Sequence, residues 1–236
     1  MGKNLKENSP IKMQPTPRKF LLAFVALSLI ELISNYLRDS VPLLHYLIKP
    51  SILMALSIYF WQETSAMKNR KRILTMQVAL FFACLGDVLL MLDGPMYFQL
   101  GLGAFLMMQI GYIVVFWTGS FRGIAIPRAI IIVVFAITLF MWIRTNLGGL
   151  FVPVFVYMLT ITTMVLTTLN RENKVQSDSF QWVFVGAALF MISDSLIAIE
   201  KFATPLPLRE ILVMLTYMAG QYLIVEGLLK ELRNDD

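Results

Sequence analysis

Long apolar stretches follow one another along nearly the whole chain, separated by short polar connections. A helix needs about 20 consecutive apolar residues to cross the hydrocarbon core of a bilayer. Because a backbone in lipid must satisfy its own hydrogen bonds, each stretch predicts a transmembrane helix. Eight such stretches are present, at residues 20–37, 42–61, 73–92, 97–118, 124–143, 150–170, 180–199 and 208–229.

The short connections leave no room for a soluble domain, so the predicted fold is an all-α membrane protein, a bundle of eight transmembrane helices. The predicted organisation is a polar N-terminal tail over 1–19, one transmembrane domain over 20–229 and a short C-terminal tail over 230–236. The first stretch lacks a small-residue cleavage site, which favours an uncleaved span over a signal peptide.

Composition agrees with this class and excludes others. Hydrophobic residues make up 58% of the chain and charged residues 15%, and the mean hydropathy is +0.71. The net charge of +5 comes from Lys and Arg scattered over the connections, so no nucleic-acid partner is predicted. One Cys and one His exclude a disulfide framework and a Cys-rich zinc site, and no metal or cofactor is predicted.

The distribution of basic residues predicts the orientation. Of the 20 Lys and Arg residues, 15 lie in the two tails and in every second connection. By the positive-inside rule both termini are cytoplasmic. The predicted location is therefore an integral multi-pass position in a bacterial inner membrane or a eukaryotic internal membrane such as the endoplasmic reticulum. The sequence does not determine the oligomeric state.

Two carboxyl groups lie inside the spans. Asp87 and Asp194 each follow the start of their span by 14 residues, and both spans run outward from the cytoplasm. A charge at bilayer depth costs at least about 2.5 to 3.5 kcal/mol, so such a residue indicates a functional site. At about 1.5 Å per residue both carboxyls lie about 21 Å along their helices, at one depth. We expect them to face one another if their helices are neighbours.

The segments around these two residues resemble each other. "LGDVLLML" and "ISDSLIAI" are 107 residues apart, which is one four-helix half of the chain. An even number of spans gives two halves of the same orientation, so the pattern is compatible with a 4+4 parallel internal repeat. Among the other spans only Gln109 and Gln221 roughly correspond.

Further polar residues fall within or beside the spans. Lys49 is near the depth of the two Asp residues, where it either snorkels to the outer surface or contributes to a site. Glu31 is mid-span, whereas Glu200 and Glu226 are near span ends and are expected to be solvated. Tyr97 opens the fourth span at the outer interface, where it belongs to an aromatic belt or contacts the substrate. The remaining candidates serve as hydrogen-bonding contacts between helices or as substrate contacts, and they are Gln109, Tyr112, Tyr157, Tyr217 and Gln221.

Several of these segments together resemble one family. The second span contains "KP", the third "GD", the fourth "YFQLGLGAFLMMQIGY", the seventh "SD" followed by "KF", and the eighth "TYMAGQYLIVEGLL". Their order and spacing resemble the YhhN family of membrane proteins, whose animal members are lysoplasmalogenases. The chain departs from the family pattern at Gln109, where His is common, and at Glu200, where Asn is common.

The resemblance implies hydrolysis of the vinyl ether bond of lysoplasmalogens to a fatty aldehyde and a glycerophospho-base. It implies a lysophospholipid substrate within membrane lipid, Asp87 and Asp194 as catalytic residues, and family-like positions for Lys49, Tyr97 and Gln221. The chemistry fits the residues independently. Protonation of the alkene creates an oxocarbenium ion, and glycosidases handle a related ion with one protonated and one ionised carboxyl group. Lys49 then either pairs with one of the two carboxylates or receives the substrate phosphate.

Two other functions use the same residues. In a small proton- or cation-coupled transporter the paired Asp residues form a relay or a cation site, and Gly86 and Pro50 are compatible with broken helices. In a structural protein an Asp pairs with Lys49 only to fix helix packing, and joint removal of the charges is tolerated.

Overall fold

The computed structural model describes residues 18–37, 41–121 and 123–235. Within these ranges it contains eight helices long and apolar enough to cross a membrane, which confirms the predicted eight-helix fold. The helices are α1 (Arg18–Tyr36), α2 (Pro42–Thr64), α3 (Arg70–Met91), α4 (Pro95–Phe116), α5 (Ile126–Ile143), α6 (Phe151–Leu169), α7 (Ser177–Phe202) and α8 (Arg209–Asp235).

Helix ends follow local backbone signals as well as hydropathy. Proline is in the first turn of α2, α4 and α5, where its missing N–H leaves no hydrogen bond unmade. The Asn69 side chain accepts a bond from the Arg72 N–H and caps α3. α8 continues to Asp235, beyond the apolar stretch that ends at residue 229, because backbone bonding extends past the part of a helix that lipid surrounds. α2 continues through Pro50 and α3 through Gly86 without a break.

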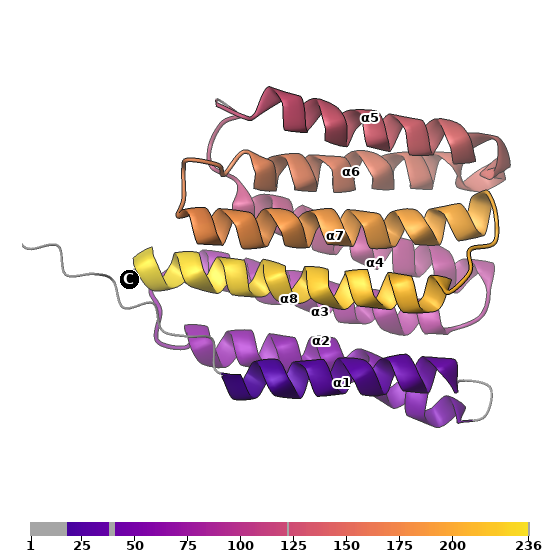
Figure 1. Ribbon diagram of the computed structural model, residues 1–236, viewed down its shortest axis with the longest axis horizontal. Coiled ribbons are helices and arrows are strands. Elements are labelled where there is room, and N and C mark those ends of the chain that lie inside the picture. Colours follow the sequence, from indigo (N-terminus) through magenta and orange to yellow (C-terminus); the bar gives the residue numbers. More distant parts are fainter. Residues whose placement is uncertain (1–17, 38–40, 122, 236) are drawn as a thin grey trace, which may run out of the picture.

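The helices lie side by side along one long direction (Figure 1). α1 begins and α8 ends at the same end of the bundle, on the left in Figure 1, which we call the termini end. The opposite end contains the first turns of α2, α4, α6 and α8. The most extensive packing joins α3 to α4 and α7 to α8. The cytoplasmic position of the termini and the internal repeat stay predictions.

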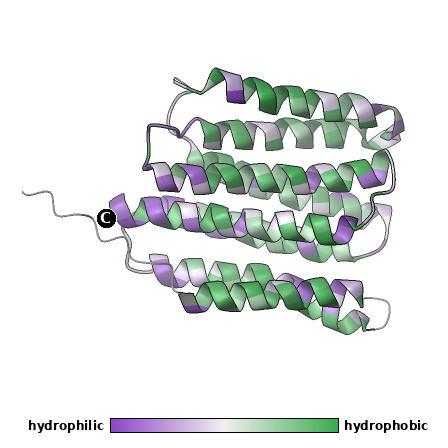
Figure 2. Cartoon of the chain, viewed as in Figure 1, coloured by the Kyte–Doolittle hydropathy of each residue, from purple (hydrophilic) through white to green (hydrophobic). Residues whose placement is uncertain are grey.

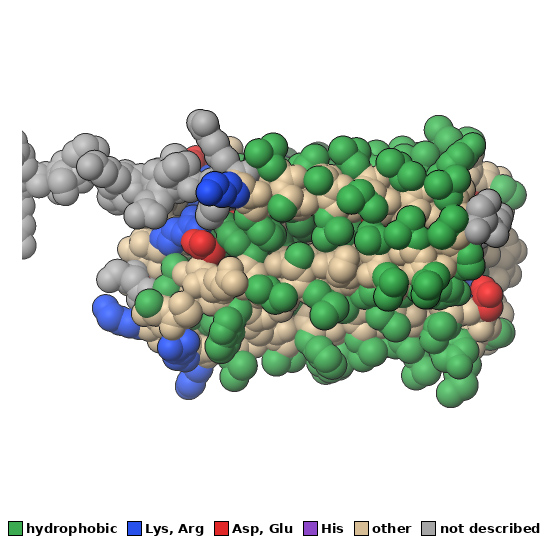
Figure 3. Space-filling model, turned by 90° about the horizontal axis from the view of Figure 1, so that it is seen from below, with side chains coloured by type: hydrophobic (Ala, Val, Ile, Leu, Met, Phe, Trp, Pro, Cys, Tyr) green, Lys and Arg blue, Asp and Glu red, His purple; other side chains and the backbone are tan. Residues whose placement is uncertain are grey.

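The surface is apolar between the two ends. Hydrophobic residues fill the middle of the helices, and polar residues gather toward the helix ends (Figure 2). Figure 3 shows a continuous apolar face, with Lys and Arg side chains at the termini end. Leu22, Ile131 and Val152 are about two-thirds exposed on different helices, at 69%, 67% and 66%. Such a large exposed apolar surface is stable in contact with lipid and not with water. The chain is therefore an integral multi-pass membrane protein.

α8 lies in the interior, against α1, α2 and α7. It approaches α7 most closely where two glycines face each other. A Cβ atom at Gly220 would lie 2.8 Å from the backbone oxygen of Gly186, and one at Gly186 would lie 2.7 Å from that of Gly220. Small residues allow helices in membranes to approach in this way. The expectation that Glu226 is solvated is wrong, because α8 is buried there and the Tyr59 hydroxyl donates a 2.6 Å hydrogen bond to the Glu226 carboxylate.

Candidate functional site

Asp87 is a buried carboxyl group near the end of α3 that lies away from the termini. Its carboxylate Oδ2 accepts a 2.8 Å hydrogen bond from the hydroxyl of Tyr217 on α8. Both side chains are almost fully buried, at 4% exposure each. A tyrosine hydroxyl is a neutral donor, so it satisfies this carboxyl group without neutralising its charge.

Asp194 has the same kind of partner on other helices. The hydroxyl of Tyr157 on α6 donates to Oδ2 of Asp194 on α7. Asp194 follows Ser177, the first residue of α7, by 17 residues, and Asp87 follows Arg70, the first residue of α3, by the same number. The two carboxyls therefore lie at a similar depth, in the half of the bundle away from the termini.

Apolar side chains separate the two carboxyl–tyrosine pairs. α3 and α7 share no extensive interface in the described ranges, and side chains of α4 and α8 fill the space between them. The Phe105 ring of α4 lies 6.0 Å from the Tyr217 ring and 6.2 Å from the Phe190 ring. The Phe105 ring has room there because Gly86 of α3 has no side chain. A Cβ atom at Gly86 would lie 2.8 Å from this ring. The charge of Asp87 is the smallest of three influences on Asp194, after burial and the Tyr157 hydroxyl.

Lys49 connects a second group of charges to Asp87. It interacts electrostatically with Asp87 and also with Glu31 of α1. Glu31 is fully buried, and its carboxylate lies 3.2 Å from Nδ1 of His45 and accepts a 2.9 Å bond from the Ser34 hydroxyl. Sequence reasoning identified Glu31 as an intramembrane acid but missed His45. The signal was available, because the short connection between α1 and α2 brings residues near 31 and 45 to one depth.

The remaining polar candidates separate into three places. Tyr112 donates a hydrogen bond to Gln221, whose Nε2 lies 3.3 Å from the Met108 sulfur, deep between α4 and α8. The Gln109 amide is fully buried beside the Tyr157 hydroxyl, and neither of its polar atoms has a hydrogen bond of standard geometry among the described residues. Tyr97 is partly exposed in the first turn of α4.

An apolar cavity of about 70 Å³ lies beside Asp194. Asp194 and Tyr157 are polar groups in its wall, and Phe105 also contacts it. Apolar side chains supply most of the rest, among them Leu90, Phe98, Leu102, Ala136, Leu139, Val154, Met158, Ile161, Met191, Ile197, Ala198 and Phe202. The cavity has the polarity of a hydrocarbon chain, but at about 70 Å³ it has room for only a short part of one, beside the Asp194 carboxyl group.

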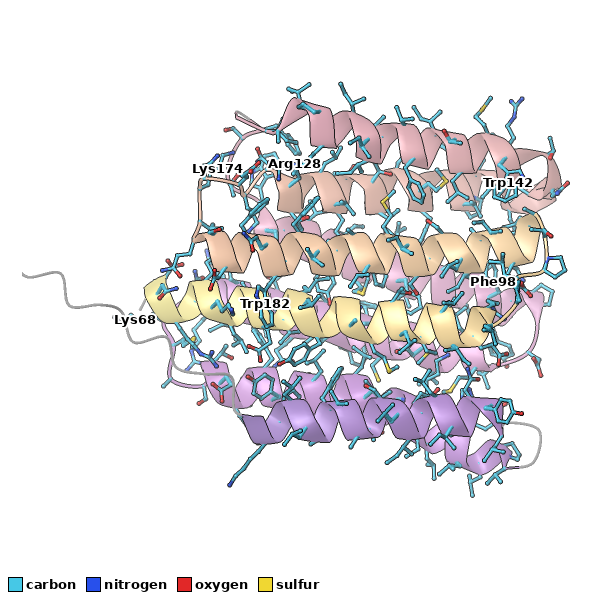
Figure 4. The ribbon with its side chains drawn as sticks, in the orientation of Figure 1. Lys68, Phe98, Arg128, Trp142, Lys174 and Trp182 are labelled. Atoms are coloured by element: carbon cyan, nitrogen blue, oxygen red, sulfur yellow. The ribbon has the colours of Figure 1, made fainter. Side chains whose placement is uncertain are left out.

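A second, larger cavity of about 660 Å³ lies at the end of the bundle away from the termini. It is polar and charged, with Lys49, Asp93, Glu200, Lys201 and Arg209 in its wall. Three residues, Leu90, Phe98 and Ile197, line both cavities, so the charged cavity adjoins the apolar one. Figure 4 labels Phe98 near this end of the bundle. The predicted site residues that line neither cavity are Asp87, Tyr97, Gln109, Tyr112, Tyr217 and Gln221.

A separate ionic network lies at the termini end. The buried guanidinium of Arg171, in the connection between α6 and α7, donates to Glu231 and to the Ser179 hydroxyl, and Arg72 lies 2.9 Å from the same Glu231 carboxylate. Burial lowers the pKa of Arg171, and the charge of Glu231 opposes this shift. These charges are paired with one another, far along the helices from the two Asp residues.

The fold and site define a multi-pass membrane protein with two carboxyl–tyrosine pairs inside the bundle, of which one is buried and the other is partly buried beside an apolar cavity. No three His, Cys, Asp or Glu side chains in the described part of the chain are grouped so as to hold a metal ion. The sequence model of the YhhN family matches residues 44–228, and the chain belongs to this family.

Two curated relatives carry the same activity name. The chain is 30% identical over 152 residues to lysoplasmalogenase TMEM86A of Bos taurus, which is 62% of each chain. It is 38% identical over 72 residues to lysoplasmalogenase TMEM86B of Sus scrofa, which is 30% of each chain. The match thus spans less than two thirds of either relative. No solved structure matches the chain significantly.

Proposed function

We propose that this protein is an intramembrane hydrolase that cleaves the vinyl ether bond of lysoplasmalogens to a fatty aldehyde and a glycerophospho-base. One observation carries the proposal: Asp194, hydrogen-bonded by Tyr157, lines an apolar cavity that adjoins a charged one. The names of the two curated relatives support the same activity. The substrate has an apolar chain, a vinyl ether and a charged head group in that order, which matches the order of the cavities.

The surroundings of the two carboxyl groups favour different roles. Asp194 lies in an apolar wall, and an apolar environment with a carboxylate nearby favours a protonated carboxyl group. Asp87 is also buried and also accepts from a tyrosine, so these features do not separate the two groups. The difference is Lys49, whose positive charge acts on Asp87 and favours an ionised carboxylate there. We therefore assign Asp194 as the general acid and Asp87 as the carboxylate that stabilises positive charge and acts as a base.

In this proposal the Phe105 ring, which lines the apolar cavity and lies between the two pairs, turns aside so that Asp87 also faces the substrate. The reaction then balances within the dyad. Asp194 gives its proton to the alkene carbon next to the ether carbon, which leaves an oxocarbenium ion near the Asp87 carboxylate. Water adds to the ether carbon and gives a proton to Asp87, which forms a hemiacetal. Asp87 then protonates the departing glyceryl oxygen while the hemiacetal hydroxyl proton returns to Asp194. The products are the aldehyde and the glycerophospho-base, and both carboxyl groups regain their starting states.

The remaining sequence candidates take supporting roles in this proposal. Tyr157 and Tyr217 orient the two carboxyl groups, and Gln109 lies within reach of the Tyr157 hydroxyl. Tyr112 and Gln221 hold α4 against α8 behind the site. Lys49 adjoins both Asp87 and the charged cavity. Tyr97 remains a candidate contact for lipid at the membrane surface.

The test uses purified protein in lipid nanodiscs with a lysoplasmalogen and with its saturated ether analogue. We expect aldehyde from the vinyl ether lipid and none from the analogue, because only the alkene accepts the proton. No aldehyde from either lipid would contradict the proposal and favour a transporter. The unbroken course of α2 through Pro50 and of α3 through Gly86 weighs against the discontinuous helices expected of one.

A further inference from the structure

The charged cavity has an excess of cations in its wall. Lys49, Lys201 and Arg209 face two carboxylates, Asp93 and Glu200. Glu200 already accepts a hydrogen bond from the backbone N–H of Leu206. Within the described ranges neither Lys201 nor Arg209 forms an ion pair with a carboxylate. The cavity therefore offers positive charge that the protein itself leaves available.

Arg209 also holds a donor that lacks a partner. Its Nε–H is buried and has no hydrogen bond to any described residue. A buried guanidinium donor left unpaired is costly, and Arg209 lines the charged cavity, so an acceptor bound in that cavity would satisfy it. Arg209 is the first residue of α8, a helix of 27 residues, whose first free N–H groups also favour an anion.

The two cavities meet at a junction that is apolar on one side and positively charged on the other. The Lys201 ammonium lies 4.1 Å from the centroid of the Phe98 ring. Phe98 lines both cavities, so its ring lies between the apolar wall around Asp194 and the cations of the charged cavity. A ligand that crosses this junction has a hydrocarbon part on one side and an anionic part on the other.

We propose that the charged cavity binds the phosphate of a single-chain phospholipid, with Arg209 and Lys201 as its ligands. Arginine provides paired donors for phosphate oxygens, and lysine adds a point charge. This inference rests on the proposed function for the position of the hydrocarbon chain. It adds the residues that select a phosphorylated substrate over a neutral one.

The kinetic test compares a lysoplasmalogen with a 1-alkenylglycerol that has the same vinyl ether and no phosphate. For Arg209→Gln and Lys201→Gln we expect KM for the lysoplasmalogen to rise about tenfold each, with kcat within about twofold. Turnover of the alkenylglycerol stays as in the wild type, which also shows that the variants are folded. Arg144→Gln is the matched control, because Arg144 is exposed at the same end and lies outside the charged cavity.

A binding test separates this inference from the proposed function. The probe is the saturated ether lysophospholipid, and its binding to wild type and variants in nanodiscs needs no hydrolysis. If the wild type binds it and both variants bind about tenfold more weakly, the phosphate subsite stands even if no aldehyde forms from any lipid. If aldehyde forms but both variants have wild-type KM and kcat for the lysoplasmalogen and for the alkenylglycerol, the phosphate subsite is overturned. The proposed hydrolase activity is then still supported. Inorganic phosphate that binds as tightly as the lysolipid would assign the cavity to free phosphate and overturn the lipid assignment.

Discussion

The two ends of the bundle both bury charge, but they surround it differently. At the termini end Arg171 is fully buried, its guanidinium is bonded to Glu231 and Ser179, and it lies 4.8 Å from the centroid of the Phe116 ring. In the other half, Asp87 and Asp194 are each bonded by a neutral tyrosine hydroxyl. The first region pairs opposite charges directly, whereas in the second region the carboxyl groups can gain or lose a proton.

This difference explains what each region does. A buried carboxylate that is paired with arginine stays ionised, and removing either partner leaves the other charge buried without full compensation. A carboxyl group whose hydrogen bond comes from a neutral hydroxyl keeps that bond in either protonation state and can exchange a proton. The ionic network therefore stabilises the fold, and the carboxyl–tyrosine pairs are suited to chemistry.

The largest expected effect is the loss of activity when either central carboxyl group is neutralised. Asp194→Asn and Asp87→Asn each lower aldehyde release from lysoplasmalogen by about a thousandfold, since proton transfer is lost. Unfolding of both variants stays close to that of the wild type, as the amide retains the tyrosine hydrogen bond. Asp178→Asn, an exposed carboxyl at the start of α7, is the control and leaves activity unchanged. Near-normal turnover by both Asp194→Asn and Asp87→Asn would contradict the proposal that the carboxyl–tyrosine pairs carry out chemistry and the ionic network does not.

The reverse pattern is expected at the termini end. Arg171→Gln lowers the free energy of unfolding by about 3 kcal/mol, because Glu231 loses its buried partner. Below the unfolding transition its kcat stays that of the wild type. Arg128→Gln removes an exposed pair with Glu172 and costs less than about 1 kcal/mol. Equilibrium unfolding in mixed micelles measures both, and a large fall in kcat for Arg171→Gln would show that the network takes part in catalysis.

A smaller effect is expected where α7 and α8 cross, between the two regions. Gly220→Ala places a methyl group 2.8 Å from a backbone oxygen of α7, and the overpacking costs about 2 kcal/mol. Gly103→Ala is the matched control, because a Cβ atom there meets nothing within 4 Å and a helix gains from alanine. Thermal unfolding in detergent compares the two. Equal stability of both variants would contradict the close crossing.

The smallest expected effect comes from the tyrosine hydroxyls. Tyr157→Phe and Tyr217→Phe each lower kcat/KM by about tenfold, since each removes one hydrogen bond that orients a carboxyl group. Tyr36→Phe, at the exposed end of α1, is the control with no effect. A loss as large as that of the Asp variants would make the hydroxyls themselves proton carriers.

The sequence predicted the eight spans, the absence of room for a soluble domain and the two intramembrane carboxyl groups. It could do so because lipid imposes its requirement residue by residue: each spanning segment must be apolar and helical, and each charge inside it stands out. The expectation for Glu226 failed because distance from a span end does not measure burial. α8 is covered there by other helices, and Tyr59 reaches it from α2.

Only the tertiary structure decided which groups meet. Tyr217 and Tyr157 were two polar residues among several, and their pairing with Asp87 and Asp194 depends on how four helices are rotated toward one another. The charged cavity likewise combines Lys49, Lys201 and Arg209 from three helices, and no spacing along the chain relates them. Hydropathy acts along one segment at a time, whereas side-chain partners follow from close approaches such as Gly86 to Phe105 and Gly186 to Gly220, which exist only once the helices are packed.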